Sequence, residues 1–175
     1  MESKLYIGID VGSKGFISMQ KDGKWQFFSI EDNDLYQLSQ IMMNARADNL
    51  NIACVIEDVK PIFGSSAKAT FSFGFNKGYL IGLLAANKIP YTLVAPKEWQ
   101  KTIWTNADMV VTHKTVMIKG KECVRKEVNT KQTSINACKR LFPTIDLRKS
   151  ARSKKPDDNK VDSMLLCEYG RRKNF

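Results

Sequence analysis

The sequence has few cysteines and no long apolar segment, and each absence excludes a class of protein. The four cysteines are scattered and form no Cys-x-x-Cys pair, so reduced thiols are expected rather than disulfides or a zinc site. No apolar run approaches the roughly 20 residues that a membrane span needs. The first residues, Met1 to Lys4, lead directly into an apolar run and leave no room for a secretory signal. We therefore expect a cytoplasmic protein with no membrane partner.

The sequence does have the size of a folded domain and a large excess of positive charge. Its 175 residues, of which 43% are hydrophobic, predict one domain, 1–175, with a buried core. Lysine and arginine total 28 against 18 acidic residues, giving a formal net charge of +10. The excess is concentrated between Lys139 and Lys173, where eleven basic residues stand against five acidic ones. This concentration favours a polyanionic partner, and a phosphate backbone in particular.

Acidic residues occur in three separate segments where an ordinary fold would not favour them. Asp10 stands at the end of the apolar run 5–11, and Glu57 closes a second apolar run that begins at Ile52. Asp158 and Asp162 open a predicted C-terminal helix. A carboxylate at the end of a buried strand is costly unless it is paired or bound to a cation. The three segments together predict one shared site for divalent metal ions.

The helical acids also have a simpler interpretation. Asp158 and Asp162 are four residues apart and share one face of a helix, but acids at a helix N-terminus are favoured by the helix dipole. That simpler interpretation suffices for Asp157, and for Asp158 taken alone. Asp162 differs, because its apolar neighbours, Val161 and Met164 to Leu166, place it near the buried face.

The strand acids differ in the same way. An aspartate before a turn, such as Asp10, often hydrogen-bonds only backbone amides, whereas Glu57 has no turn to serve. Asp58 points to the opposite side of the strand and is not expected to be a ligand.

Oxygen ligands select hard cations, so the predicted cofactor is Mg²⁺, with Mn²⁺ as a substitute. Two such ions roughly 3.5–4 Å apart support phosphodiester hydrolysis.

Apolar periodicity and turn residues predict a mixed α/β sandwich. An Asp-Gly hairpin signal at Asp22-Gly23 joins the second and third strands. The segment from about 105 to 127 predicts a β insertion, in which the only histidine, His113, is interpreted as solvent-exposed rather than as a catalytic base. The predicted strands are 5–11, 15–20, 25–30, 52–57 and 91–95, with 52–57 beside the first; the predicted helices are 35–49, 71–87, 96–104, 130–141 and 157–172; a basic linker covers 148–156.

The order of these motifs resembles that of the RuvC-like Holliday junction resolvases of the RNase H-like superfamily. The resemblance rests on Asp10 in the run Ile-Gly-Ile-Asp-Val-Gly, on Glu57 closing a strand, and on the acidic C-terminal helix. The segment 158–163, Asp-Asn-Lys-Val-Asp-Ser, is similar to the variant of phage and prophage members. Segments 73–78, 95–101 and 130–133 also fit, so that the resemblance spans 5–170 apart from 105–127. It implies an RNase H-like fold with a central mixed five-stranded sheet flanked by helices.

The resemblance also implies roles for individual residues. Asp10, Glu57, Asp158 and Asp162 would be the metal ligands, and Lys131 would contact the phosphate near the cut. Two positions depart from the family pattern: Gln100 aligns with a basic position that Lys101 would fill, and Asn159 stands where many bacterial members carry an acid or histidine. The residues expected to contact DNA are Lys101, Lys131, Phe73, Phe75, Lys77, Arg148, Lys149, Arg152, Lys154 and Lys155; Phe73 or Phe75 is the candidate wedge.

The family works as a homodimer, which would place two sites across a four-way junction. Gly74, Gly78 and Gly82 are spaced by four and would allow close packing against a second helix. A helix of the same chain serves equally well as that partner.

The function implied is Mg²⁺-dependent resolution of four-way DNA junctions by paired symmetric nicks that leave 5′-phosphate and 3′-hydroxyl ends. The alternatives are another RNase H-like nuclease that cleaves RNA–DNA hybrids or flaps, and a non-catalytic DNA-binding module. A sugar-kinase or actin-like ATPase, which the run from Asp10 to Ser13 resembles, needs two such domains, and this chain is too short. The carboxylates disfavour the binding module, because acids at a DNA surface weaken binding unless metal ions offset them.

Overall fold

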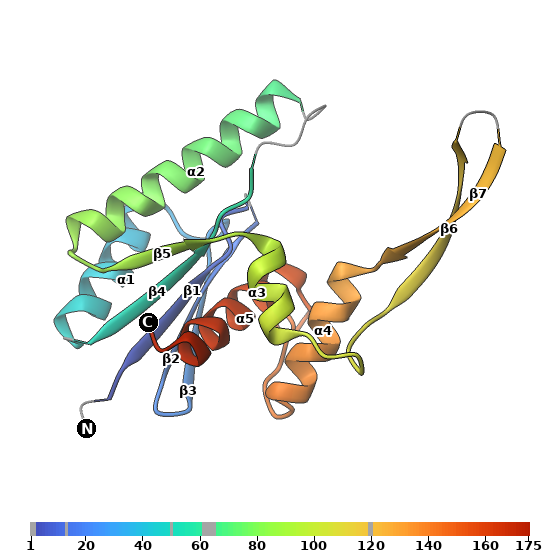
Figure 1. Ribbon diagram of the computed structural model, residues 1–175. Helices are drawn as coiled ribbons and strands as arrows, with labels where there is room; N and C mark the ends of the chain where they lie inside the picture. Colours follow the sequence, from blue (N-terminus) through green and yellow to red (C-terminus); the bar gives the residue numbers. More distant parts are fainter. Residues whose placement is uncertain (1–2, 13, 50, 61–65, 119–120) are drawn as a thin grey trace.

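A five-stranded mixed sheet organises the fold (Figure 1). The computed structural model describes residues 3–12, 14–49, 51–60, 66–118 and 121–175. The strands lie in the order β3-β2-β1-β4-β5, with β1 antiparallel to β2 and parallel to β4. Their bounds are Leu5–Ile9 for β1, Phe16–Lys21 for β2, Lys24–Ser29 for β3, Ile52–Glu57 for β4 and Tyr91–Val94 for β5. The predicted mixed five-stranded sheet, with β4 beside β1, is confirmed.

The two central strands are apolar because both faces of the sheet are covered. In β1, Leu5, Ile7 and Ile9 are buried, and β4 is buried from Ile52 to Ile56. The β2–β3 hairpin turns through Asp22 and Gly23, whose φ angles of 51° and 76° are both positive. This is the backbone of a two-residue hairpin turn that follows the strand twist, as the Asp-Gly pair predicts.

Helices cover both faces of the sheet, and each face has its own hydrophobic core (Figure 1). Helices α1 and α2 lie on one face, where Leu38, Met42, Leu80 and Leu84 join the core. Helices α3, α4 and α5 lie on the other face and build a second core around Trp99. The helix bounds are Leu35–Ala47 for α1, Ala67–Ala86 for α2, Pro96–Ile103 for α3, Thr130–Leu141 for α4 and Asp158–Lys173 for α5. None of the helices in the described part of the chain is long and apolar enough to cross a membrane.

Helix α5 packs directly on the backbone of β1, and a glycine makes this possible. A Cβ atom on Gly8 would lie 2.0 Å from the Ser163 carbonyl oxygen and 2.6 Å from the Cys167 nitrogen. The buried hydroxyls of Ser18 and Ser163 are hydrogen-bonded at 2.6 Å, and the Cys167 thiol donates to the Ser18 carbonyl at 3.0 Å. These contacts fix where the first turns of α5, with their acids, lie relative to the end of β1.

A long β-hairpin projects from the other elements (Figure 1). Strands β6 (Val111–Ile118) and β7 (Lys121–Val128) pair antiparallel as a separate two-stranded sheet. The hairpin occupies the segment where a β insertion is expected. The residues from Glu122 to Glu127 lack a clear alternation of apolar and polar side chains, so the sequence does not give the bounds of the second strand.

Helix α2 begins four residues before the predicted start at Phe71. The Ser66 hydroxyl accepts a hydrogen bond from the Ala69 amide at 3.2 Å and caps the helix. The first turns, from Ala67 to Thr70, are exposed and carry no apolar period, so periodicity alone could not place this start. The prediction of 71–87 was therefore wrong at its N-terminal boundary.

Candidate active site

Asp10 lies just beyond β1 in a buried position, with a side chain only 9% exposed. The Gly12 amide donates a hydrogen bond to its Oδ1 at 3.2 Å. Burial raises the pKa of Asp10 to about 7, against the lowering effect of that amide and with further raising by Glu57, Asp158 and Asp157. Gly15 lies directly behind, because a Cβ there would come within 2.0 Å of the Asp10 carbonyl oxygen. The turn thus holds a buried carboxylate that accepts little hydrogen bonding to offset the cost of its burial.

Glu57 ends β4, the parallel neighbour of β1. Ile9 of β1 is in register with Ile56 of β4, so the residues that follow, Asp10 and Glu57, stand at the same end of the sheet and on the same face. The Trp99 indole nitrogen donates to Glu57 Oε1 at 2.9 Å. Burial raises the pKa of Glu57, and the Trp99 hydrogen bond partly offsets the rise. Trp99, which is fully buried on α3, therefore orients this carboxylate.

Asp162 comes from the second turn of α5 and carries a buried oxygen without a partner. Its Oδ1 has no hydrogen-bond partner in the described structure. Burial raises the pKa of Asp162 well above its ordinary value; Ser134 lowers it, while Asp10, Glu57 and Asp158 raise it. A buried carboxylate oxygen with no donor is costly, and a cation is a natural partner for it.

Asp158 and Asp157 stand at the start of α5 and have different partners. Asp158 forms an ion pair with Lys131 of α4. Asp157 is the N-cap of α5, and its side chain accepts from the Lys160 amide at 3.0 Å. Capping satisfies an amide that a helix start leaves free, so Asp157 has a structural role that needs no metal.

The four predicted ligands thus gather at one end of the sheet, from β1, β4 and α5. Mutual repulsion couples Asp10, Glu57, Asp158 and Asp162. Within the described residues, no three histidine, cysteine, aspartate or glutamate side chains lie close enough to cage one ion. In donor chemistry the set fits a hard divalent cation, because all donors are oxygens and Asp162 Oδ1 is unsatisfied.

The predicted DNA contacts on the helices have different environments. Lys131 is 74% exposed in the first turn of α4, and its ion pair with Asp158 raises its pKa. Lys101 is exposed in the last turn of α3. Lys77 forms an ion pair with Asp58. Lys131 is therefore the lysine that reaches the acids directly, whereas the Lys77 charge is already countered.

The two candidate wedge residues differ in exposure. Phe73 is partly buried and packs against the core beneath α2. Phe75 is 53% exposed, and its ring lies 5.6 Å from that of Tyr79. Phe75 is therefore the one free to meet a partner, while Phe73 serves the core.

The predicted basic linker is held by a lysine that sequence reasoning missed. Lys160 is buried, and its ammonium donates to the carbonyls of Asp146 at 2.9 Å and Arg148 at 3.1 Å. It also lies 4.0 Å from the centre of the Phe27 ring. Lys160 thereby fixes the loop that carries the linker, and only a tertiary contact reveals this role.

Within that linker, two basic side chains are paired and three are exposed. Arg148 pairs with Asp146 at 2.8 Å, and Lys149 pairs with Glu31 at 2.9 Å. The exposed side chains are those of Arg152, Lys154 and Lys155.

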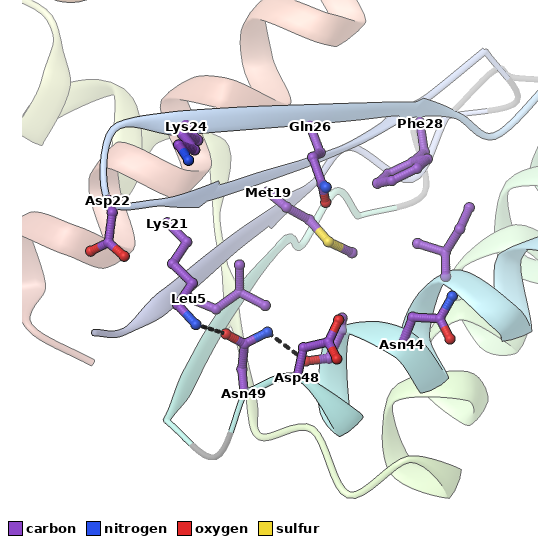
Figure 2. A pocket seen from close by; sticks show the side chains of 12 residues that line it. Leu5, Met19, Lys21, Asp22, Lys24, Gln26, Phe28, Asn44, Asp48 and Asn49 are labelled. Carbon is purple, nitrogen blue, oxygen red and sulfur yellow. Dashed lines mark hydrogen bonds between the residues drawn. The ribbon is translucent and has the colours of Figure 1, made fainter. Parts of the chain in front are cut away.

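A pocket of about 560 Å³ lies beside the start of β1 and the β2–β3 turn (Figure 2), whereas Asp10 follows the other end of β1. Its apolar lining includes Leu5 at the start of β1 and Met19 of β2, and Lys21 reaches Asn49 across it at 2.5 Å. None of the predicted ligands lines this pocket. The candidate active site is therefore the acidic end of the sheet.

The fold is similar to that of solved RuvC structures. No protein-family model and no curated protein sequence matches this chain. A structure of T. thermophilus RuvC in complex with Holliday junction substrate aligns with a TM-score of 0.55 at 7% identity, covering 97% of this chain and 96% of that chain. A second Thermus thermophilus RuvC structure aligns with a TM-score of 0.51 at 9% identity and the same coverage. The chain has a RuvC-like fold, as the motif order predicts.

Proposed function

We propose that this protein is a divalent-metal-dependent endonuclease that resolves four-way DNA junctions by paired symmetric nicks. The observation that carries the proposal is the group of buried and partly buried, mutually repelling carboxylates at one end of the sheet, one of which has a buried oxygen without a partner. Groups arranged at this cost are typical of functional sites. The net charge of +10 favours a nucleic-acid backbone as the partner, and the RuvC-like fold supports junction DNA as the substrate.

Asp10, Glu57, Asp158 and Asp162 would hold Mg²⁺ or Mn²⁺, two ions in each site. Bound there, the ions would supply an activated water and stabilise the leaving oxygen. The chain itself contributes orientation, because Trp99 fixes Glu57 at 2.9 Å and the packing of α5 on Gly8 fixes the position of Asp162. Lys131 would leave Asp158 for the scissile phosphate, since an exposed lysine moves at little cost.

A homodimer is part of the proposal, and α2 offers a surface for it. Added Cβ atoms on Gly74, Gly78 and Gly82 would meet nothing within 4 Å, so no other part of the described chain packs against them. Phe71 and Phe75 are 76% and 53% exposed on the same helix. The spacing of these residues puts them along one apolar helix face, which a second copy of the chain would cover.

The test is cleavage of a synthetic four-way junction, a flap and an RNA–DNA hybrid in Mg²⁺. Wild type should cut the junction fastest, while Asp10→Asn and Glu57→Gln should bind it with unchanged affinity and lose cleavage by 10²-fold or more, as roughly expected for site ligands. Asp48→Asn is the matched control, because it makes the same carboxylate-to-amide change on an exposed residue at the other end of the sheet.

Two outcomes would contradict the proposal. Cleavage that survives Asp10→Asn and Glu57→Gln would remove the proposed site. Preference for the hybrid would assign the chain to the RNase H type of activity, with the same acids acting on a different substrate.

A further inference from the structure

We infer that the β6–β7 hairpin is an arm that lies along a duplex branch of the DNA, beyond the residues at the cut. The inference rests on the proposed function for its substrate. The hairpin would contact duplex away from the branch point, and the affinity for a junction would therefore depend on the length of its arms.

Two cationic side chains, Lys114 and Arg125, stand directly opposite each other on the hairpin, an arrangement that destabilises an isolated ribbon. At the adjacent position His113 is paired with Lys126. A two-stranded ribbon is also marginal on its own. No ion pair involves Lys114, Arg125 or Lys126 anywhere in the described structure. A polyanion would supply the missing compensation.

Cationic side chains lie on both faces of the ribbon, Lys126 on one and Lys114 with Arg125 on the other. Residues directly opposite share a face, and the next pair lies on the other face, so His113 with Lys126 and Lys114 with Arg125 mark opposite sides. All four side chains are exposed. Over 111–128 the sequence has five basic residues against two acidic ones. Charge on both sides suits a ribbon placed between two phosphate backbones, and the major groove of B-DNA admits a two-stranded β-ribbon.

The base of the hairpin is anchored beside the candidate active site. β7 leads through Asn129 directly into α4, whose first turn carries Lys131, the ion-pair partner of Asp158. The Asn129 amide donates to the Val110 carbonyl at 2.8 Å, closing the base of the hairpin. DNA held at the acids would therefore have the hairpin next to it.

A partly buried ion pair links α4 to the segment that precedes the hairpin. Arg140 of α4 donates to both carboxylate oxygens of Asp108, at 2.9 Å and 2.8 Å, and the Asp108 side chain is 3% exposed. The Asn136 amide also donates to the Asp108 carbonyl at 3.1 Å.

The length of the hairpin sets how far it reaches along the DNA. Its strands of eight residues extend about 26 Å, which matches roughly 7–8 base pairs at 3.4 Å per pair.

The test compares Lys114→Gln/Arg125→Gln with Lys21→Gln/Lys24→Gln. The control removes the same charge from another cross-strand basic pair, located at the end of the sheet away from the acids. Affinity for plain duplex and for junctions with arms of 5 and 15 base pairs is measured by fluorescence anisotropy over a salt series, with thermal melting to check folding.

Wild type and the control should bind the long-armed junction about tenfold more tightly than the hairpin variant. A plot of the logarithm of the binding constant against the logarithm of the salt concentration should be shallower for the hairpin variant by about 2, as expected for two lost phosphate contacts. The variant should also lose the preference for long arms. Equal affinity and arm dependence in the two double variants would overturn the inference. A variant that becomes monomeric by sedimentation where wild type is dimeric would also overturn it, because the hairpin would then serve contact between copies. Duplex binding is measured without cleavage, so failure of the nuclease proposal is visible separately.

Discussion

The contact between β1 and α5 gives the sharpest mutational prediction. In Gly8→Ala the new Cβ would meet the Ser163 carbonyl oxygen at 2.0 Å and the Cys167 nitrogen at 2.6 Å. Both are backbone atoms, so no side-chain rotation relieves the overlap. Helix α5 must withdraw by at least about 1 Å to restore ordinary contact distances. Because Asp162 lies one residue before Ser163, the shift moves a proposed ligand by a similar amount.

Two effects of different size should follow. Overpacking should lower the free energy of unfolding by about 1–3 kcal/mol, leaving a folded protein at 25 °C. Displacing a catalytic group by 1 Å can lower the rate about 10²-fold, so junction cleavage should fall far more than stability. The assay is single-turnover cleavage at saturating protein, with chemical denaturation on the same preparations.

Gly170→Ala is the graded control for this prediction. Gly170 lies near the far end of α5, and its Cβ would meet only side-chain atoms, the Val55 Cγ2 at 3.0 Å and the Tyr6 Cδ1 at 4.0 Å. Cleavage by this variant should stay near the wild-type rate. Wild-type cleavage by Gly8→Ala would refute the reasoning that the closeness of α5 to β1 sets the site geometry.

Three further predictions follow from single contacts. Metal-free Asp10→Asn should melt at a higher temperature than wild type, because it removes a buried, repelled carboxylate, while Mg²⁺ should raise the melting temperature of wild type only; equal responses to Mg²⁺ would contradict the ligand role. The Arg140 hydrogen bonds lower the pKa of Asp108 to about 2. The ionised Asp108 therefore stabilises the folded protein fully above pH 4, and this contribution is lost as the pH falls towards 2 and the carboxylate is protonated. The stability advantage of wild type over Asp108→Asn should then shrink by about 2 kcal/mol between pH 5 and pH 2, and a constant difference in urea unfolding would argue against it. Gly78→Ala should stabilise the folded monomer by about 1 kcal/mol, whereas Gly78→Trp should convert a dimer to monomer in sedimentation velocity; a dimer that persists in Gly78→Trp would exclude this helix face.

The sequence predicts the sheet well because its signals are local. The apolar runs of β1 and β4 and the Asp22-Gly23 turn carry their structure in adjacent residues. The start of α2 and the second strand of the hairpin lack such local signals, since the first is an exposed capped turn and the second is a ribbon without a buried face. Both depend on pairing or capping that periodicity does not encode.

In the candidate site, too, some residues can be found from the sequence and others only from tertiary contacts. Asp10, Glu57 and Asp162 are visible in the sequence because each stands among apolar residues, whereas Asp158 is found by its helical spacing from Asp162 and by the family resemblance. Their support is not visible, since Trp99 reaches Glu57 across 42 positions and Lys160 secures the basic loop from α5. Lys77 shows the converse, because nothing in the sequence predicts that Asp58 already neutralises it. Residues chosen by charge alone therefore need the fold before their availability to DNA can be judged.

The most direct test of the account maps the cuts on all four strands of a fluorescently labelled four-way junction in Mg²⁺. We expect nicks at symmetry-related positions on two opposing strands, with 5′-phosphate ends, and their loss in Asp10→Asn although the variant still binds. Unpaired nicks scattered along the arms, or paired nicks that persist in Asp10→Asn, would contradict it.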